Sequence, residues 1–159
     1  MSWETASYVV TVVGLPMAIM FYVLDRARQR QQEEEEIYLM LADEYVEFLK
    51  LVLSHPDLRL LDPAPSMGLD AEQAARKSAL FGILISLFER AYILTYEPKM
   101  SGADLRRWRS WEDWMREWCA RKDFRDAMDA HLAGEDPEFS AYLSQLARAV
   151  ALPVGGKQQ

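Results

Sequence analysis

The sequence predicts an all-α protein in which one N-terminal transmembrane helix continues into a small cytoplasmic bundle of about four to five helices. Three patterns support this prediction: an uncharged apolar run near the N-terminus, apolar residues at three- and four-residue steps through most of the remaining chain, and proline or glycine between the periodic segments. We divide the chain into a transmembrane anchor (1–25), a charged helical stalk (26–36), a cytoplasmic helical domain (37–152) and a flexible tail (153–159).

The apolar run from Thr5 to Leu24 is 20 residues long and contains no charged residue. A helix of about 20 residues rises about 30 Å, which matches the hydrocarbon core of a bilayer. A cleaved signal peptide fits less well, because no basic segment precedes the run and no small-residue cleavage site follows it. A buried core helix would normally be amphipathic, whereas this segment is apolar all round. The run therefore predicts a spanning helix.

Charged residues on either side of the run predict its orientation. Glu4 is the only charged residue before it, whereas Arg26, Arg28 and Arg30 follow closely behind it. Because positively charged flanks stay on the cytoplasmic side, we expect the N-terminus outside and everything from Asp25 onward inside. The expected location is the cytoplasmic (inner) membrane, with the lipid bilayer as a partner and the three arginines as the flank of the anchor.

The segment after the anchor predicts a solvated helical stalk. Residues 25–36 (DRARQRQQEEEE) contain no glycine or proline and consist of good helix formers. Four consecutive glutamates invite comparison with a metal site, but adjacent acids on a helix point in different directions and cannot converge on one ion. An apolar face then develops over residues 37–53, and we expect His55-Pro56 to end this helix.

A central helix is expected after an ordered, proline-containing loop over residues 56–69. Asp70 opens it, and Gln73 lies three residues later, which resembles a capping box. Residues 79–96 are apolar nearly all round. A second membrane span is the competing interpretation, but charges after Phe88 leave only 10 uninterrupted residues, too few to cross a bilayer.

Glu89 and Arg90 are the adjacent charges that interrupt this apolar stretch. Because buried charges need partners, one interpretation places both at the edge of the domain or pairs them with neighbouring helices. The other interpretation has Arg90 line a polar notch for an anionic group. The sequence leaves both open, and Arg90 is therefore a candidate ligand-binding residue.

Residues 104–122 (DLRRWRSWEDWMREWCARK) form the most informative segment and predict an amphipathic helix. The polar half of its helical wheel alternates in sign and includes Glu117 and Arg121. Surface-binding helices are usually basic on that face, so core packing is the favoured interpretation and contact with the membrane surface or a partner is the alternative. The candidate interaction or ligand residues on the apolar half are Trp108, Trp111, Trp114 and Trp118.

Two further helices complete the expected bundle. Residues 123–132 predict a short helix that Gly134 ends, with His131 in a structural role in the last turn. Asp136-Pro137 then opens the last helix, as a capping aspartate followed by proline at the first helical position.

Composition and motifs argue against several classes of function. A formal net charge of −7 makes the chain a poor binder of nucleic acid, because such binding rests on neutralising phosphates. The sequence contains no glycine-rich phosphate loop, no clustered metal ligands and no nucleophile elbow. Cys119 is the single cysteine, and the local sequence offers it no base. We therefore expect no catalytic residue, no metal and no cofactor, and we do not expect an enzyme.

The order of segments resembles a loose class of uncharacterised small bacterial single-pass membrane proteins with a cytoplasmic helical domain. The residues that carry the resemblance are the N-terminal span and the segments EIYLMLADEYVEFLKLVL, LFGILISLFERAYIL, RRWRSWEDWMREW and DPEF. The likeness covers most of the chain and rests on apolar spacing. It implies the architecture of an anchor and a helical domain, and it implies no activity.

These observations lead us to expect a membrane-anchored, non-catalytic helical interaction or scaffold protein. Its partner would be a second copy or a subunit of a larger membrane complex, because confinement to a membrane raises the local concentration of the domain. The alternative is a ligand-sensing or membrane-perturbing effector with a pocket near Arg90 and the Trp-rich helix. A filled core would favour the first function, and a polar pocket with an unpaired cation would favour the second.

Overall fold

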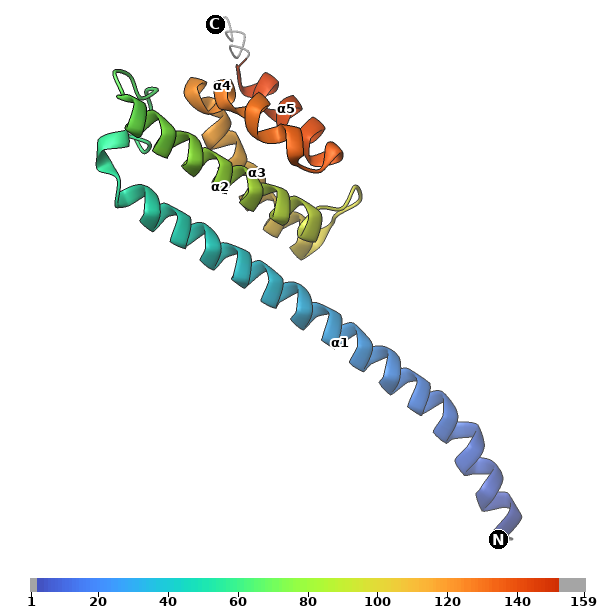
Figure 1. Ribbon diagram of the computed structural model, residues 1–159. Helices are drawn as coiled ribbons and strands as arrows, with labels where there is room; N and C mark the ends of the chain where they lie inside the picture. Colours follow the sequence, from blue (N-terminus) through green and yellow to red (C-terminus); the bar gives the residue numbers. More distant parts are fainter. Residues whose placement is uncertain (1–2, 152–159) are drawn as a thin grey trace, which may run out of the picture. The chain divides into compact units, whose positions relative to one another are not determined.

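The computed structural model describes the backbone of residues 3–151 and the side chains of residues 17–151 except 18, 27 and 31. This part of the chain is all-helical, as predicted, and contains five α-helices and no strand (Figure 1). The helices are α1 Trp3–Leu53, α2 Ala71–Thr95, α3 Gly102–Ala120, α4 Lys122–His131 and α5 Pro137–Ala151, with short 3-10 helices at Pro56–Leu58 and Leu132–Gly134. The predicted flexible tail, 153–159, lies outside the described residues.

The chain divides into two compact units, residues 1–39 and 40–159. In the first unit, α1 provides all of the described structure. Every described side chain between Met17 and Glu36 is exposed. The side chains of residues 5–16, which form most of the predicted anchor, lie outside the described ones.

Residues 40–53 of α1 belong to the second unit and present an apolar face to it. The buried residues of this face recur at three- and four-residue steps: Leu41, Tyr45, Phe48 and Val52. The helix ends at Leu53, and His55 precedes Pro56 with a non-helical backbone. The predicted helix end at His55-Pro56 is therefore confirmed, because the residue before a proline is forced out of the helical region.

The predicted capping box at the start of α2 is present. The Asp70 carboxylate accepts a hydrogen bond from the Gln73 backbone N–H at 2.8 Å, and the Gln73 side-chain oxygen accepts one from the Asp70 N–H at 3.0 Å. Two backbone donors at the helix start are thus satisfied reciprocally. The residues that α2 buries in the unit are Leu80, Phe81, Leu84, Ile85, Leu87, Phe88 and Ala91.

Within the described part of the chain, α2 is the one helix long and apolar enough to span a membrane. A core helix of a water-soluble domain can have the same length and composition. In this unit Phe81 meets Phe124 of α4 with ring centroids 5.2 Å apart, and Phe88 meets Trp111 of α3 at 6.4 Å. These contacts make α2 the central helix of the bundle.

Gly82 marks a close approach between α2 and α4. A Cβ atom at this position would lie 3.1 Å from Nδ1 of His131, so a larger residue would displace the imidazole. The other ring nitrogen of His131, Nε2, lies 3.1 Å from the Ser78 hydroxyl. His131 therefore packs between two helices, which is a structural role.

The last two helices follow local rules that the sequence shows. α4 ends at His131 and passes into a 3-10 turn that finishes at Gly134. At the start of α5, the Asp136 carboxylate accepts a hydrogen bond from the Phe139 N–H at 2.9 Å, as the predicted cap requires. The core side chains of this helix are Phe139, Leu143, Leu146 and Ala147.

Candidate functional site

Tyr45 is the centre of an aromatic cluster that joins α1 to α3. Its ring stacks on Trp114 with centroids 4.4 Å apart, and its hydroxyl accepts a hydrogen bond from Trp118 Nε1 at 3.1 Å. Burial raises the pKa of Tyr45, the hydrogen bond from Trp118 partly offsets this, and the nearby Glu117 charge raises it further. Tyr45 therefore remains neutral at physiological pH.

The four candidate tryptophans of α3 do not share one environment. Trp108, Trp111 and Trp118 are buried in the core, at 2, 0 and 4 % exposure. Core packing, the favoured interpretation of the Trp-rich face, therefore holds for these three. Trp114 is only half-buried, so it is the one that solvent or a ligand reaches most easily.

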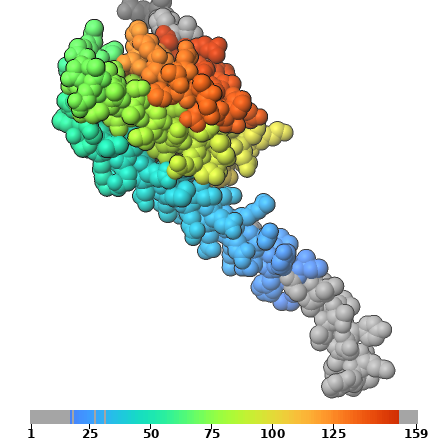
Figure 2. Space-filling view, in the orientation of Figure 1, coloured from blue at the N-terminus to red at the C-terminus, as the bar shows by residue number. Residues whose placement is uncertain are grey.

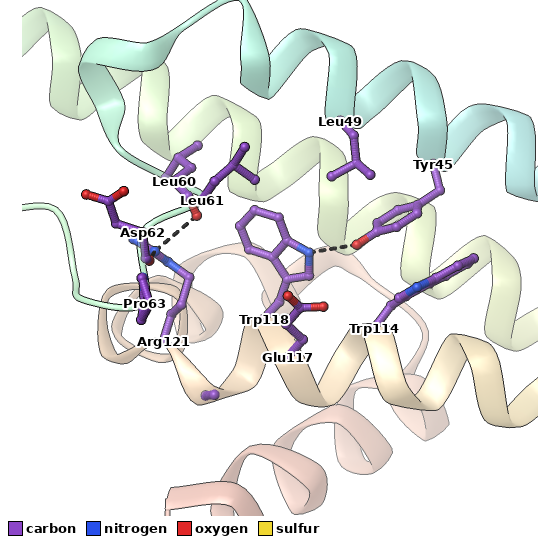
Figure 3. A pocket seen from close by; sticks show the side chains of 11 residues that line it. Tyr45, Leu49, Leu60, Leu61, Asp62, Pro63, Trp114, Glu117, Trp118 and Arg121 are labelled. Carbon is purple, nitrogen blue, oxygen red and sulfur yellow. Dashed lines mark hydrogen bonds between the residues drawn. The ribbon is translucent and has the colours of Figure 1, made fainter.

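A cavity of about 490 Å³ opens beside Trp114 and Trp118. Figure 3 shows the Trp118 indole in the middle of its wall, the Tyr45 and Trp114 rings on one side, and Leu60, Leu61 and Pro63 on the other. The residues that line it come from α1, from the loop before α2, from α3 and from the junction of α3 and α4: Tyr45, Leu49, Leu60, Leu61, Asp62, Pro63, Trp114, Glu117, Trp118, Ala120 and Arg121. A volume of this size suits a small organic ligand.

Arg121 fixes the wall of the cavity that the loop provides. Its guanidinium donates hydrogen bonds to the backbone carbonyls of Leu60, at 3.0 Å, and of Asp62. It also forms an ion pair with the Asp123 carboxylate at 3.0 Å. Asp123 in turn accepts a hydrogen bond from the Ser66 backbone N–H at 3.2 Å. The ion pair therefore ties the loop to the junction of α3 and α4.

The prediction that Arg121 lies on the exposed polar half of the Trp-rich helix is wrong. Its residue surface is only 6 % exposed. The reason is that α3 ends at Ala120, two residues before the end that the amphipathic pattern predicts, and Arg121 has an extended backbone. A helical wheel does not describe a residue that lies outside the helix.

The carboxylate of Asp123 is ionised more easily than an ordinary aspartate. Burial alone would raise its pKa, but the hydrogen bonds from Arg121 and Ser66 and the charges of Arg121 and Lys77 outweigh burial, so its pKa is lowered. Lys77 of α2 forms a second ion pair with it at 3.4 Å. The ionised Asp123 carboxylate thus neutralises the buried charge of Arg121.

Glu117 is the carboxylate at the cavity that has no cation to neutralise it. Among the described residues, no ion pair or hydrogen bond engages its side chain, although it lines the same cavity as Arg121. Asp62, the other acid of the lining, pairs with Arg59 at 2.7 Å. The cavity therefore combines aromatic and aliphatic walls with one uncompensated negative charge.

Arg90 lies in a different place, at a groove of about 900 Å³ between residues 40–51 of α1 and 82–90 of α2. Figure 2 shows these two segments next to each other on one face of the second unit. The Arg90 guanidinium forms an ion pair with Glu44 at 2.5 Å. Groove and cavity share no lining residue, so the structure does not bring Arg90 and the Trp-rich helix into one pocket.

The remaining reactive groups are held in structural contacts. Burial raises the pKa of the Cys119 thiol to about 12, although the charges of Arg125 and Arg116 lower it in part. The His55 Nδ1 lies 2.9 Å from the Leu51 carbonyl. Among the described residues, no three His, Cys, Asp or Glu side chains are grouped to hold a metal ion.

The three arginines of the predicted anchor flank, Arg26, Arg28 and Arg30, lie on α1 with exposed side chains.

The sequence patterns did not indicate Tyr45, Glu117 or Arg121 as site residues. The helical pattern assigned each of these residues to one face of its helix. That the three line one cavity depends on contacts between segments that are distant in the sequence.

Comparison of the chain with protein-family models, curated protein sequences and solved structures found no match.

Proposed function

We propose that the chain is a membrane-anchored, non-catalytic helical interaction protein, with its anchor in residues 5–24 and its helical domain on the cytoplasmic side. The supporting observation is a band of exposed apolar side chains in the first unit. Its described members, each between 47 and 67 % exposed, are Met17, Ile19, Met20, Phe21, Tyr22, Val23 and Leu24.

A band of this kind fits lipid better than water or a single flat partner. Apolar surface costs ~25 cal/mol per Å² when it stays in water, and large exposed apolar patches mark contacts with a membrane or a partner. Consecutive helical residues point in all directions around the axis. A protein partner on one side would cover only part of the band, whereas lipid surrounds all of it.

The arginines that follow the band support the orientation. Arg26, Arg28 and Arg30 are exposed and can reach anionic headgroups on the cytoplasmic side.

An alternative anchor in α2 would break the polar contacts that hold this helix in its domain. Glu89 accepts a hydrogen bond from the Asp136 N–H at 2.5 Å, and Arg90 pairs with Glu44. These contacts favour an anchor in residues 5–24.

The groove between α1 and α2 is the surface that we propose for a protein partner. Its apolar residues include Met40, Leu51 and Ile83, which are between 38 and 49 % exposed. Gly82 and Ser86 of α2 also line the groove. Exposed apolar residues along two neighbouring helices suit a third helix that adds its own apolar stripe.

The charges at the groove specify the chemistry of that third helix. Asp43 lines the groove and has no ion pair among the described residues, and Glu47 has only an exposed pairing with Lys50 at 2.7 Å. Glu44 is neutralised by Arg90. The α1 side of the groove is therefore acidic, and we propose a partner helix whose apolar stripe is flanked by lysine or arginine. A partner in the same membrane would meet the groove at high local concentration.

Purification of the full chain from its native host in a mild, neutral detergent tests this function. We expect one companion at fixed stoichiometry, and a photo-crosslinker at position 83 should join it through a helix with flanking basic residues. Ile83→Asp should remove the companion, because it places a charge in the groove. Ile93→Asp is the matched control, since Ile93 is an isoleucine of α2 that is 59 % exposed and lies outside the groove.

Three results would contradict parts of the proposal. A monomer that purifies without a companion would exclude a stable interaction. Equal loss of the companion in Ile83→Asp and Ile93→Asp would exclude the groove. Release of the chain from membranes by alkaline carbonate would exclude the anchor independently of either result.

A second candidate function, ligand sensing, is favoured by one observation, the cavity beside Trp118. Its position differs from the pocket near Arg90 that the sequence leads us to expect. The cavity lies within the domain and would couple ligand binding to the contact between α1 and α3.

A further inference from the structure

The groove proposed for a protein partner does not include the cavity at Trp118, and the chemistry of this cavity specifies a ligand. This cavity has the composition of a site for a positively charged organic molecule: aromatic rings, aliphatic walls and one carboxylate without a partner among the described residues. We propose that it binds an ammonium group carried on a small apolar body, such as a quaternary or protonated alkylammonium. The inference stands on this cavity alone and does not require the proposed function.

The charges around the cavity select a cation over an anion. Among the described residues of the lining, Arg121 is the only one with a cationic side chain, and it is occupied by Asp123 and by two backbone carbonyls. An anion would therefore find no free donor with a positive charge there. Glu117 has no counter-charge among the described residues, so an incoming cation would gain an ion pair without breaking one.

The aromatic rings provide the second part of the recognition. Tryptophan is the best aromatic partner for a cation over its face, and Trp118 and Trp114 both line the cavity. Glu117 and Trp118 both line this cavity (Figure 3), and we place the ammonium group of the ligand between the carboxylate and the ring. The Tyr45 hydroxyl accepts from Trp118, and its own hydrogen has no acceptor among the described residues. That hydrogen can donate to a polar oxygen on the ligand.

The opposite wall suits an apolar body. Leu49 comes from α1, and Leu60, Leu61 and Pro63 come from the loop that Arg121 holds in place. Two carbonyls of this loop, those of Leu60 and Asp62, accept hydrogen bonds from Arg121. A ligand with methyl or methylene groups beside its ammonium group would therefore contact both walls at once.

Binding of choline to the full chain in a neutral maltoside detergent, followed by calorimetry and tryptophan fluorescence, tests this inference. The control ligand is 3,3-dimethylbutanol, which has the shape of choline without its charge. We expect choline to quench tryptophan fluorescence and to bind about tenfold more tightly than the neutral analogue, because the cation–π and ion-pair contacts require the charge. Equal binding of the two, or binding of neither, would overturn the inference.

Two variants, compared with one control, locate the site. Glu117→Gln keeps the shape of the side chain and removes its charge, and it should raise the Kd for choline about fivefold. Asp113→Asn is the matched control, because Asp113 is an exposed acid of the same helix that does not line the cavity. Trp114→Leu should also weaken choline binding. Identical Kd values for Glu117→Gln and Asp113→Asn would place binding elsewhere and contradict the inference.

The ammonium group can come from a free amine or from a lipid headgroup, and one further comparison separates them. The chain is placed in nanodiscs of phosphatidylcholine or of phosphatidylglycerol, and choline is added to each. Choline that binds only in phosphatidylglycerol identifies the lipid headgroup as the competing occupant. Choline that binds equally in both identifies a free amine. Absence of binding in both contradicts the site.

Discussion

The Arg121 guanidinium lies 3.0 Å from the Asp123 carboxylate, and both side chains are almost fully buried, at 7 and 10 % exposure. This pair joins three parts of the second unit. Arg121 holds the carbonyls of the loop before α2, and Asp123 binds Lys77 of α2 and the Ser66 N–H. The position of the cavity wall therefore depends on one buried ion pair at the junction of α3 and α4.

Removal of the Asp123 charge should destabilise the domain strongly. Asp123→Asn leaves the Arg121 guanidinium buried without a counter-charge, which costs ~3 kcal/mol of the free energy of unfolding. Asp126→Asn is the control, because Asp126 forms an exposed pair with Lys122 on the same helix, and it should cost less than ~1 kcal/mol. Denaturant unfolding followed by tryptophan fluorescence measures both values. Equal losses of unfolding free energy in the two variants would show that the buried ion pair stabilises the domain no more than the exposed one.

The same carboxylate predicts a loss of stability in acid. The pKa of Asp123 is lower in the folded state than its ordinary value, so the folded state binds this proton less tightly than the unfolded state does. Its stabilisation is complete above the ordinary pKa and is lost as the pH falls through the lowered one. Melting temperatures between neutral pH and pH ~2 should fall more steeply for the natural chain than for Asp123→Asn. Parallel curves would argue against the lowered pKa.

Glu135 should have the opposite effect. A hydrogen bond shared with Glu89 is the main cause that raises the pKa of Glu135, and burial and the Glu89 charge add to it, although the bond from Ser86 lowers it. The folded state therefore binds the proton of the Glu135 carboxyl group more tightly than the unfolded state does. The stabilisation that this proton provides is lost as the pH rises through the raised pKa.

Glu135→Gln should consequently stabilise the domain at neutral pH by ~0.5 kcal/mol, since it removes one of two neighbouring like charges. The gain in melting temperature should shrink as the pH falls toward the ordinary pKa of glutamate, where both states are protonated. Glu138→Gln, which changes an exposed acid of α5, serves as the control. A gain in melting temperature that does not depend on pH would contradict the raised pKa of Glu135.

Cys119 should be inert while the domain is folded. With the pKa of its thiol at about 12, the thiolate fraction at pH 7 is ~10⁻⁵, and the side chain is inaccessible as well. A maleimide should label it only after denaturation, whereas a cysteine at the exposed position 54, in Ser54→Cys, should be labelled at once. Mass spectrometry of the two proteins measures the rates. Rapid labelling of Cys119 in the folded chain would show that α3 opens locally.

Local rules explain which parts of the fold the sequence predicts. The caps at Asp70 and Asp136 and the helix end at His55-Pro56 depend on residues within four positions of one another. The burial of Trp108 and Trp111 follows from their spacing on one helical face. Such features are readable because the interacting groups are close in sequence.

The candidate site is not readable in this way. Trp118 and Tyr45 are 73 positions apart, and Arg121 and the Leu60 carbonyl are 61 apart. The sequence places Arg121 on a polar face because its helix was expected to continue to residue 122, and the early end at Ala120 changes its surroundings completely. For Arg90 the sequence left two options open, and the structure shows both an ion pair with Glu44 and a place in the lining of the groove.

The side of the membrane on which the N-terminus lies tests the proposed anchor most directly. Two variants, Ser2→Cys and Ser54→Cys, are expressed in bacterial cells, and spheroplasts are treated with a membrane-impermeant maleimide, with the natural chain as the background. We expect Ser2→Cys to be labelled in intact spheroplasts and Ser54→Cys to be labelled only after permeabilisation, because position 2 precedes the apolar run and position 54 follows it. Labelling of Ser54→Cys in intact spheroplasts, or recovery of the chain in the soluble fraction, would contradict a cytoplasmic domain on an N-terminal anchor.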